Sequence, residues 1–136
     1  MSDDPFLHEV PISFGDCDPA GIVFYPNFFA WMDAGFHALL RARSEGHAAL
    51  CKRFGARGIG LIAVESRFLS PARDGDLLVL ELRLAGWSLR SLRIDYAGRI
   101  GERPVFEATE TRGIFVPKDG RITAADTAPL RALLEG

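Results

Sequence analysis

The sequence predicts an α+β domain in which one long helix separates a first strand from a series of antiparallel strands. Apolar residues alternate near the N-terminus, recur every three or four residues after Pro26, and alternate again beyond Arg57. The later connections are too short for parallel crossovers, so neighbouring strands should be antiparallel. A strand, a long buried helix and four or more strands in this order are typical of the α+β class.

The first strand is predicted over Glu9–Phe14. Val10, Ile12 and Phe14 are apolar at alternate positions, which is the period of a half-buried strand. Gly15 follows and should end it.

The long helix is predicted to begin at Pro26, with Tyr25 as its N-cap residue. Proline is favoured at the first helical position, where its missing N–H would have had no partner in any case. Arg41, Arg43 and Gly46 should mark the end of the helix. One broad face is apolar and should be buried, through Phe28, Trp31, Met32, Gly35, Phe36, Leu39 and Leu40.

The rest of the chain is predicted to be rich in strands. Ser44–Arg57 is interpreted as a short polar connection, and glycine-containing turns separate the segments that follow it. The predicted elements are strands over 62–68, 78–84, 87–97, 103–116 and 121–123 and a short terminal helix over Ala125–Leu134.

The composition fits one globular domain over residues 1–136. The chain carries 16 basic and 18 acidic residues, a net charge of −2, which argues against a nucleic-acid or membrane-surface partner. No segment has the apolar length of a membrane span or the pattern of a signal peptide, so a cytoplasmic location is expected. The two cysteines, Cys17 and Cys51, are too few for a disulfide framework.

The acidic loop Gly15-Asp-Cys-Asp-Pro-Ala-Gly21 permits several interpretations. Cys17 lies between two carboxylates that oppose thiolate formation, so it is expected to pack rather than react. Asp16 and Asp18 resemble the magnesium-binding loop of haloacid-dehalogenase-type phosphotransferases, but further oxygen ligands are few. A carboxylate before Pro-x-Gly also commonly caps a turn.

A further interpretation joins the carboxylate to the helix behind it. The first N–H groups of a helix have no intrahelical acceptor, and Tyr25-Pro26-Asn27 opens the helix directly after the acidic loop. Such amides can polarise a carbonyl and stabilise its oxyanion, while a carboxylate attacks the carbonyl carbon or takes a proton from water. This pairing is suited to acyl transfer.

Residues 15–35, GDCDPAGIVFYPNFFAWMDAG, resemble the signature of the 4-hydroxybenzoyl-CoA thioesterase family. Weaker similarity continues downstream through Arg57-Gly-Ile59, Ser66-Arg-Phe68, Asp74-Gly-Asp76 and Trp87-Ser-Leu-Arg-Ser91. The resemblance implies the hotdog fold, a curved antiparallel sheet around a long helix. It also implies an acyl-CoA thioesterase that acts on an aromatic or a short- to medium-chain acyl group, and homodimers or homotetramers with active sites between subunits.

The same resemblance assigns roles to particular residues. Asp18 matches the family's catalytic aspartate, as nucleophile or general base, and Tyr25 supplies the backbone N–H for the thioester carbonyl. Asp33 matches an acidic residue of the acyl pocket, and the alternative is a structural role in which it bonds to backbone groups or to an arginine. Phe24, Trp87 and Arg90 are expected among the substrate-binding residues, with Arg93 and Arg112 near Arg90 in sequence. No metal or cofactor is expected, since coenzyme A arrives as part of the substrate.

Two rival functions remain at this stage. A non-catalytic acyl-CoA-binding hotdog domain would keep the fold without hydrolysing the thioester. A dehydratase or hydratase of the same fold would normally pair a histidine with the acid, and no histidine lies in the motif. His37 and His47 are interpreted as ordinary surface or helix-end residues.

Overall fold

The computed structural model describes residues 4–135. Its six strands form one antiparallel sheet in the order β1-β3-β4-β5-β2, and β6 pairs with β5. The predicted domain, 1–136, extends to residues 1–3 and 136, which lie outside the described part. The elements are β1 (Phe6–Pro11), the 3-10 helix η1 (Phe14–Asp16), α1 (Pro26–Arg43), α2 (His47–Phe54), β2 (Gly58–Phe68), β3 (Leu77–Trp87), β4 (Leu92–Ile100), β5 (Arg103–Lys118), β6 (Arg121–Ala124) and α3 (Ala128–Glu135).

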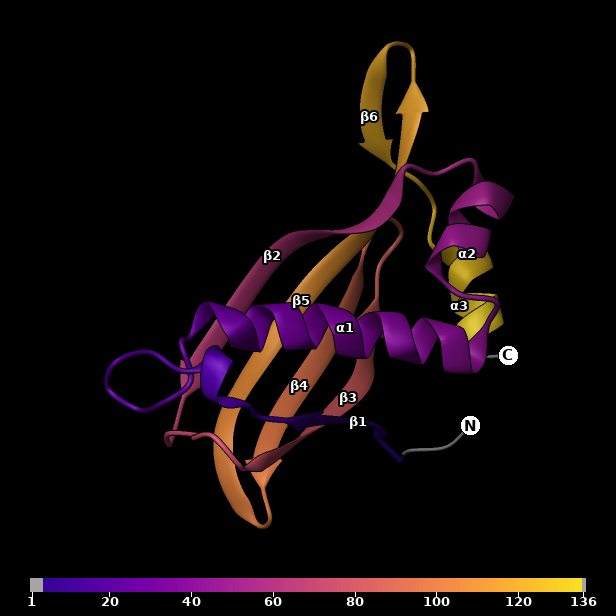
Figure 1. Cartoon of the computed structure of the whole chain (residues 1–136). Coiled ribbons are helices and arrows are strands. Elements are labelled where there is room, and N and C mark those ends of the chain that lie inside the picture. The colour runs from indigo at the N-terminus through magenta and orange to yellow at the C-terminus, as the bar shows by residue number, and fades with distance from the viewer. Residues whose placement is uncertain (1–3, 136) are drawn as a thin grey trace.

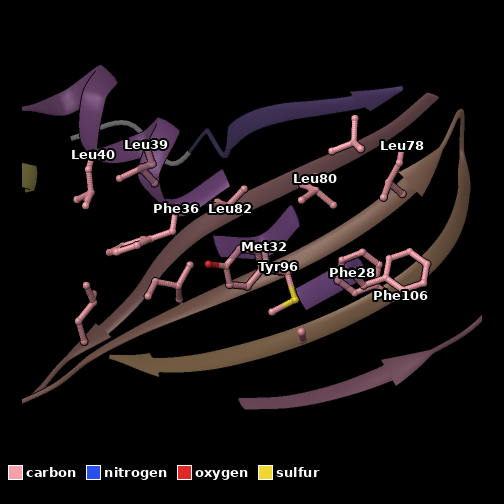
Figure 2. Packing of buried hydrophobic residues seen from close by; sticks show 14 of the residues in the cluster. Phe28, Met32, Phe36, Leu39, Leu40, Leu78, Leu80, Leu82, Tyr96 and Phe106 are labelled. Atoms are coloured by element: carbon pink, nitrogen blue, oxygen red, sulfur yellow. The ribbon is translucent and has the colours of Figure 1, made fainter. Parts of the chain in front are cut away.

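The sheet curves around α1, which lies across its concave face (Figure 1). The apolar face of α1 meets side chains of β3, β4 and β5, and Figure 2 shows Met32 and Phe36 directed at them. This arrangement agrees with the predicted buried helix. Six of its residues are buried, namely Phe28, Met32, Gly35, Phe36, Leu39 and Leu40, and Trp31 is partly buried.

An aromatic contact fixes the N-terminal half of α1 against the sheet. Gly98 of β4 lies opposite Phe106 of β5, and the Phe106 ring covers the position where a side chain on Gly98 would lie. The ring centroid of Phe106 is 5.0 Å from that of Phe28 on α1 (Figure 2). The missing side chain at Gly98 thus provides room for the ring on which the helix rests.

The first strand differs from its predicted limits. It spans Phe6–Pro11, and the chain then forms η1 rather than continuing in the sheet. Val10 and Ile12 are buried as the alternation indicates, but Phe14 is 81% exposed. An apolar residue at the right spacing is therefore not always part of the buried face.

The segment predicted as a polar connection contains the helix α2. It has eight residues and only one buried side chain, Leu50, so it carries too few turns to show a helical period. Farther on, β3 extends to Trp87, and the next strand begins at Leu92 instead of residue 87. The terminal helix α3 confirms the predicted C-terminal helix, beginning three residues later at Ala128.

Within residues 4–135, no helix is both long and apolar enough to cross a membrane.

Candidate active site

A short antiparallel ladder holds the acidic loop at the start of α1. Cys17 and Val23 form an isolated bridge, and the N–H of Asp18 donates to the carbonyl of Ile22 at 2.9 Å. The N–H of Phe24 donates to the carbonyl of Asp16, also at 2.9 Å. The two halves of the loop are thereby fixed relative to each other.

Two further hydrogen bonds attach this loop to the rest of the fold. The N–H of Val23 donates to the carbonyl of Ala72, in the β2–β3 connection, at 2.8 Å. The side-chain amide of Asn27 in α1 donates to the carbonyl of Asp16 at 2.8 Å. The loop and the start of α1 are therefore one hydrogen-bonded unit.

The two aspartates of the loop have different surroundings. One carboxylate oxygen of Asp16 accepts hydrogen bonds from the N–H and the hydroxyl of Ser13, at 2.9 and 3.0 Å, which closes η1. Asp16 therefore has the turn-capping role that was one of the alternatives. Cys17 between them packs against the core as expected.

Asp18 is half-buried and only partly used by its own turn. Its Oδ1 accepts the N–H of Ala20 at 2.8 Å, and the turn closes with the N–H of Gly21 donating to the carbonyl of Asp18. Gly21 has a φ of 81°, in the region that favours glycine. No group within residues 4–135 donates to Asp18 Oδ2, so this oxygen is available to a ligand.

The backbone N–H of Tyr25 has no acceptor in the part of the chain that the structure describes. Pro26 has no N–H, while Asn27 and Phe28 donate to the carbonyls of Phe24 and Tyr25 at 3.0 and 3.1 Å. Helix α1 begins at Pro26 with Tyr25 before it, as predicted. Its first unpaired amide is therefore that of Tyr25, at the positive end of the helix dipole.

Aromatic side chains surround this end of α1. Phe24 and Tyr25 are exposed and meet edge to face with ring centroids 5.6 Å apart. Phe68 at the end of β2 lies 6.4 Å from Tyr25 and 5.5 Å from Phe28. The adjoining cavity of about 600 Å³ has mostly apolar walls, formed by Ile22, Val23, Tyr25, Phe28, Phe68, Leu69, Ser70, Pro71 and Ala72.

Asp33 lies farther along α1, in a different cavity. It is about 12 Å along the helix axis from Tyr25 at the usual rise per residue. Its Oδ1 accepts a hydrogen bond from Arg112 of β5 at 3.0 Å, and its side chain is 56% exposed. The sequence left open whether this carboxylate binds an arginine or lines a pocket, and the structure places it in both situations.

Arg112 is not a surface arginine, although the backbone of Arg90 lies close to the neighbouring Gly113 of β5. Its side chain is only 4% exposed on the concave side of the sheet, where it binds Glu110 and Asp33. Arg93 is exposed and lies 3.5 Å from Asp95.

Trp87 and Arg90 lie next to the C-terminal segment. The indole N–H of Trp87 donates to Oε1 of Glu135 in α3 at 2.7 Å. Arg90, in the β3–β4 turn, donates to the carbonyl of Ala124 at 2.7 Å. Both side chains have structural partners, and their predicted contact with substrate stays a prediction.

His37 and His47 line the cavity that contains Asp33, so they are not ordinary surface residues, although His47 does lie at a helix end, the start of α2. Their ring centroids are 4.7 Å apart, and His37 Nε2 is 3.7 Å from Asp33 Oδ1. Sequence reasoning missed them because His47 lies in the unpredicted helix α2. The i, i+4 spacing of Asp33 and His37 on one helix was the signal available for His37.

Comparison with known proteins identifies the family. The profile of the thioesterase superfamily matches residues 20–107, which is more than half of the chain. The chain belongs to the thioesterase superfamily. This family of thioester hydrolases is the one that the motif at residues 15–35 indicates, and the matched segment includes Tyr25 and Asp33.

Individual members of the superfamily extend this result. The 4-hydroxybenzoyl-CoA thioesterase of Pseudomonas sp. (strain CBS-3) is 31% identical over 81 residues, which cover 59% of this chain and 57% of that relative. The match thus spans little more than half the length of the relative. Its solved structure has a TM-score of 0.85 and 25% identity, and covers 96% of this chain and 99% of the other.

A more distant member supports the fold alone. The 1,4-dihydroxy-2-naphthoyl-CoA thioesterase of Synechocystis has a TM-score of 0.79 at 18% identity, over 94% of each chain. Together with the preceding match, it confirms the predicted α+β hotdog architecture.

The magnesium interpretation has no structural support in the described residues. Among residues 4–135, no three His, Cys, Asp or Glu side chains form a group that could hold a metal ion. Asp16 binds Ser13 and Asp33 binds Arg112, so two of the acidic residues of the motif are engaged by separate partners.

Proposed function

We propose that this protein is an acyl-CoA thioesterase that hydrolyses an aromatic, hydroxybenzoyl-like acyl-CoA, or a short- to medium-chain one, to the free acid and coenzyme A. The observation that carries the proposal is the pairing of Asp18 and Tyr25 on one hydrogen-bonded loop. Asp18 offers an unengaged carboxylate oxygen, and Tyr25 offers an unengaged backbone N–H at the start of α1. The name of the Pseudomonas relative supports the aromatic class.

In this reaction the thioester carbonyl oxygen accepts a hydrogen bond from the N–H of Tyr25. The amide and the helix dipole stabilise the negative charge that develops on that oxygen as the carbonyl carbon becomes tetrahedral. Asp18 either attacks the carbon, giving an anhydride that water then hydrolyses, or takes a proton from the attacking water. In both routes the C–S bond breaks, and the departing thiolate of coenzyme A takes a proton, from solvent in the first route and from the protonated Asp18 in the second.

Asp33 is proposed to contact the acyl group rather than the reacting carbonyl. Its position, about 12 Å along α1 from Tyr25, is too distant for direct participation on the same subunit. A homodimer or homotetramer with sites between subunits would combine Asp18 of one protomer with Asp33 of another. The carboxylate of Asp33 could then accept a hydrogen bond from a substrate hydroxyl.

The edge strand β2 favours such a dimer. It pairs with β5 on one side only, and its Leu61 and Ile62 are 48% and 51% exposed. An unpaired edge with exposed apolar side chains is suited to pairing with another strand. A second copy added at β2 would extend the sheet and cover these residues.

The first experiment measures thiol release from benzoyl-CoA, 4-hydroxybenzoyl-CoA and hexanoyl-CoA. Asp18→Asn should keep the circular dichroism spectrum and lose at least about 100-fold in kcat, since it retains the shape but not the charge of the carboxylate. Near-normal turnover by this variant would refute the role of Asp18. Single-turnover hydrolysis in oxygen-18 water separates the two routes, because the anhydride route can leave label in Asp18.

The shared site has its own test. Asp18→Asn and Asp33→Ala chains, co-expressed with different tags and purified as mixed dimers, should have a higher kcat/KM on 4-hydroxybenzoyl-CoA than either parent variant, because one of the two shared sites then has both Asp18 and Asp33. Mixed dimers with a kcat/KM no higher than that of the Asp33→Ala dimer would contradict a site built from two protomers.

The alternative is a non-catalytic acyl-CoA-binding domain of the same fold. It predicts that isothermal titration detects binding of the same thioesters while no thiol is released by the unmodified protein. An unengaged Asp18 oxygen on the loop that leads into α1 favours hydrolysis over binding alone.

A further inference from the structure

The cavity that contains Asp33 lies between α1 and the edge strand β2 and has a volume of about 560 Å³. Phe29, Leu61 and Val64 give it apolar walls, while its polar groups come from α1, α2 and β5. Those polar groups are Asp33, His37, His47, Glu110 and Arg112. Two of them, Glu110 and Arg112, are buried charged residues on a strand whose other inward side chains are apolar.

The guanidinium of Arg112 is held by several fixed acceptors. Its Nε donates to Glu110 Oε1 at 2.9 Å and its Nη2 to Glu110 Oε2 at 3.2 Å, a two-point contact. Its Nη1 donates to the carbonyl of Ile59 on β2 at 3.2 Å. The guanidinium lies over the ring of Phe36, with the Arg112 Cζ 4.3 Å from the ring centroid. These contacts fix the guanidinium in a single orientation.

Glu110 is itself fixed from the other side. The hydroxyl of Tyr96 on β4 donates to Glu110 Oε1 at 2.5 Å, and both residues are buried. Burial raises the pKa of Tyr96 far above its ordinary value, and the negative charge of Glu110 raises it further, so the hydroxyl keeps its proton. The Tyr96–Glu110–Arg112 chain therefore runs from the core of the sheet to the wall of the cavity.

Asp33 is the last member of this chain and the only one that is largely exposed. Arg112 Nη2 occupies its Oδ1, and no group within residues 4–135 donates to its Oδ2. A carboxylate at the surface of a helix otherwise samples several rotamers, and a hydrogen bond to a fixed partner removes that freedom. Asp33 is held with one oxygen engaged and the other available.

We infer that Arg112 is a positioning residue for recognition of the acyl group, which holds Asp33 so that its second oxygen accepts a hydrogen bond from a hydroxyl on that group. The inference rests on the proposed thioesterase function and adds the residue on which discrimination depends. Hydroxylated acyl groups are the substrate class that gains from this arrangement. Unsubstituted acyl groups contact the same apolar walls but form no hydrogen bond with Asp33.

The test compares kcat/KM for 4-hydroxybenzoyl-CoA and benzoyl-CoA in matched variants. Arg112→Lys keeps a positive charge but loses the fork that reaches Glu110 and Asp33 together. It should lower the ratio of the two constants about fivefold or more, mainly through KM of the hydroxylated substrate. Asp33→Ala should lower the ratio at least as far, because the lost hydrogen bond serves only the hydroxylated substrate.

A second variant allows for the loss of a buried ion pair. Removing Arg112 alone leaves the buried carboxylate of Glu110 without its partner. The triple variant Tyr96→Phe/Glu110→Met/Arg112→Met therefore replaces all three hydrogen-bonded residues with apolar side chains of similar size. This variant should also lose the preference for the hydroxylated substrate. The control is Arg99→Met, because Arg99 binds Glu81 at 3.0 Å outside the cavity, and it should leave the ratio unchanged.

A double-mutant cycle separates positioning from general support of the fold. In an Asp33→Ala background, Arg112→Lys should have no further effect on the ratio, because the residue that it positions is absent. A ratio unchanged by Arg112→Lys, or an equal loss on both substrates, would overturn the inference while leaving the thioesterase function intact. If the unmodified protein hydrolyses no acyl-CoA, the proposed function fails and the inference fails with it.

Discussion

The imidazole Nε2 of His47 accepts a hydrogen bond from the backbone N–H of Ile59 at 3.0 Å. An acceptor nitrogen carries no proton, so this bond exists only while the imidazole is neutral. It joins the start of α2 to the start of β2, next to the carbonyl of Ile59 that binds Arg112. The wall of the Asp33 cavity therefore depends on the protonation state of a histidine in α2.

This relationship predicts a loss of stability on acidification. Burial lowers the pKa of His47 below its ordinary value of 6.5, the charges on His37 and Arg112 lower it further, and Asp33 opposes them. The unfolded chain therefore binds the proton more readily, so the stabilisation is complete above about pH 6.5 and is lost as the pH falls through the folded-state pKa. The melting temperature should fall between pH 7.5 and 5.

His47→Gln is the matched variant, since its amide oxygen can still accept from Ile59 but does not titrate. Its melting temperature should depend less on pH over the same range, measured by circular dichroism. The pKa of His8 is also lowered, by burial and by Arg41, so His8 makes a second contribution to the pH dependence of the melting temperature. His8→Gln serves as the comparison, and an unaltered pH profile in His47→Gln would contradict the assignment.

Gly98→Ala should destabilise the fold. A Cβ at this position would lie 2.3 Å from the Phe106 ring, which cannot swing aside because it is buried against Phe28. We expect a loss of about 1–3 kcal/mol in the free energy of unfolding, measured by urea denaturation. Gly86→Ala in β3 is the control, since a Cβ there meets nothing within 4 Å, and equal losses in the two variants would argue against the close contact.

Tyr25→Pro tests the backbone amide of Tyr25 directly. The φ of Tyr25 is −56°, which a proline ring tolerates, so the substitution removes the N–H with little change of conformation. We expect kcat to fall by about 100- to 1,000-fold. Tyr25→Ala removes the same side chain but keeps the amide and should retain most of the activity. Equal kcat values in the two variants would exclude the amide as the donor to the carbonyl.

Two substitutions at Trp87 separate its structural role from its predicted contact with substrate. Trp87→Phe and Trp87→Ala both remove the hydrogen bond to Glu135, so each should loosen the end of α3 and lower its protection from hydrogen exchange. Only Trp87→Ala removes the ring, so only this variant should raise KM for the acyl-CoA. If KM is unchanged in both, Trp87 does not contact the substrate.

The features that the sequence predicts well are those that depend on local chemistry. Pro26 sets the start of α1 because a proline fits only the first turn of a helix, and the spacing of the residues after it reports the buried face. Asp18 and Tyr25 lie on one hydrogen-bonded loop and are close in sequence, so a single motif contains both.

The features that the sequence misses depend on contacts between distant segments. Glu110 and Arg112 lie at inward positions of β5, yet nothing in their local sequence shows that Arg112 meets Asp33, which is 79 residues away. The helix α2 forms mainly because Leu50 and His47 find partners elsewhere, not because eight residues favour a helix by themselves.

The buried Glu110–Arg112 pair also restricts how this protein can diverge. A change at either position alone leaves an uncompensated charge in the core, whereas joint replacement by apolar residues keeps the fold. Asp33 is released from its partner whenever Arg112 changes. Among descendants of this sequence, positions 33, 110 and 112 should therefore be inherited or replaced as a set, and a gain of a new acyl preference at this cavity should require several coordinated mutations.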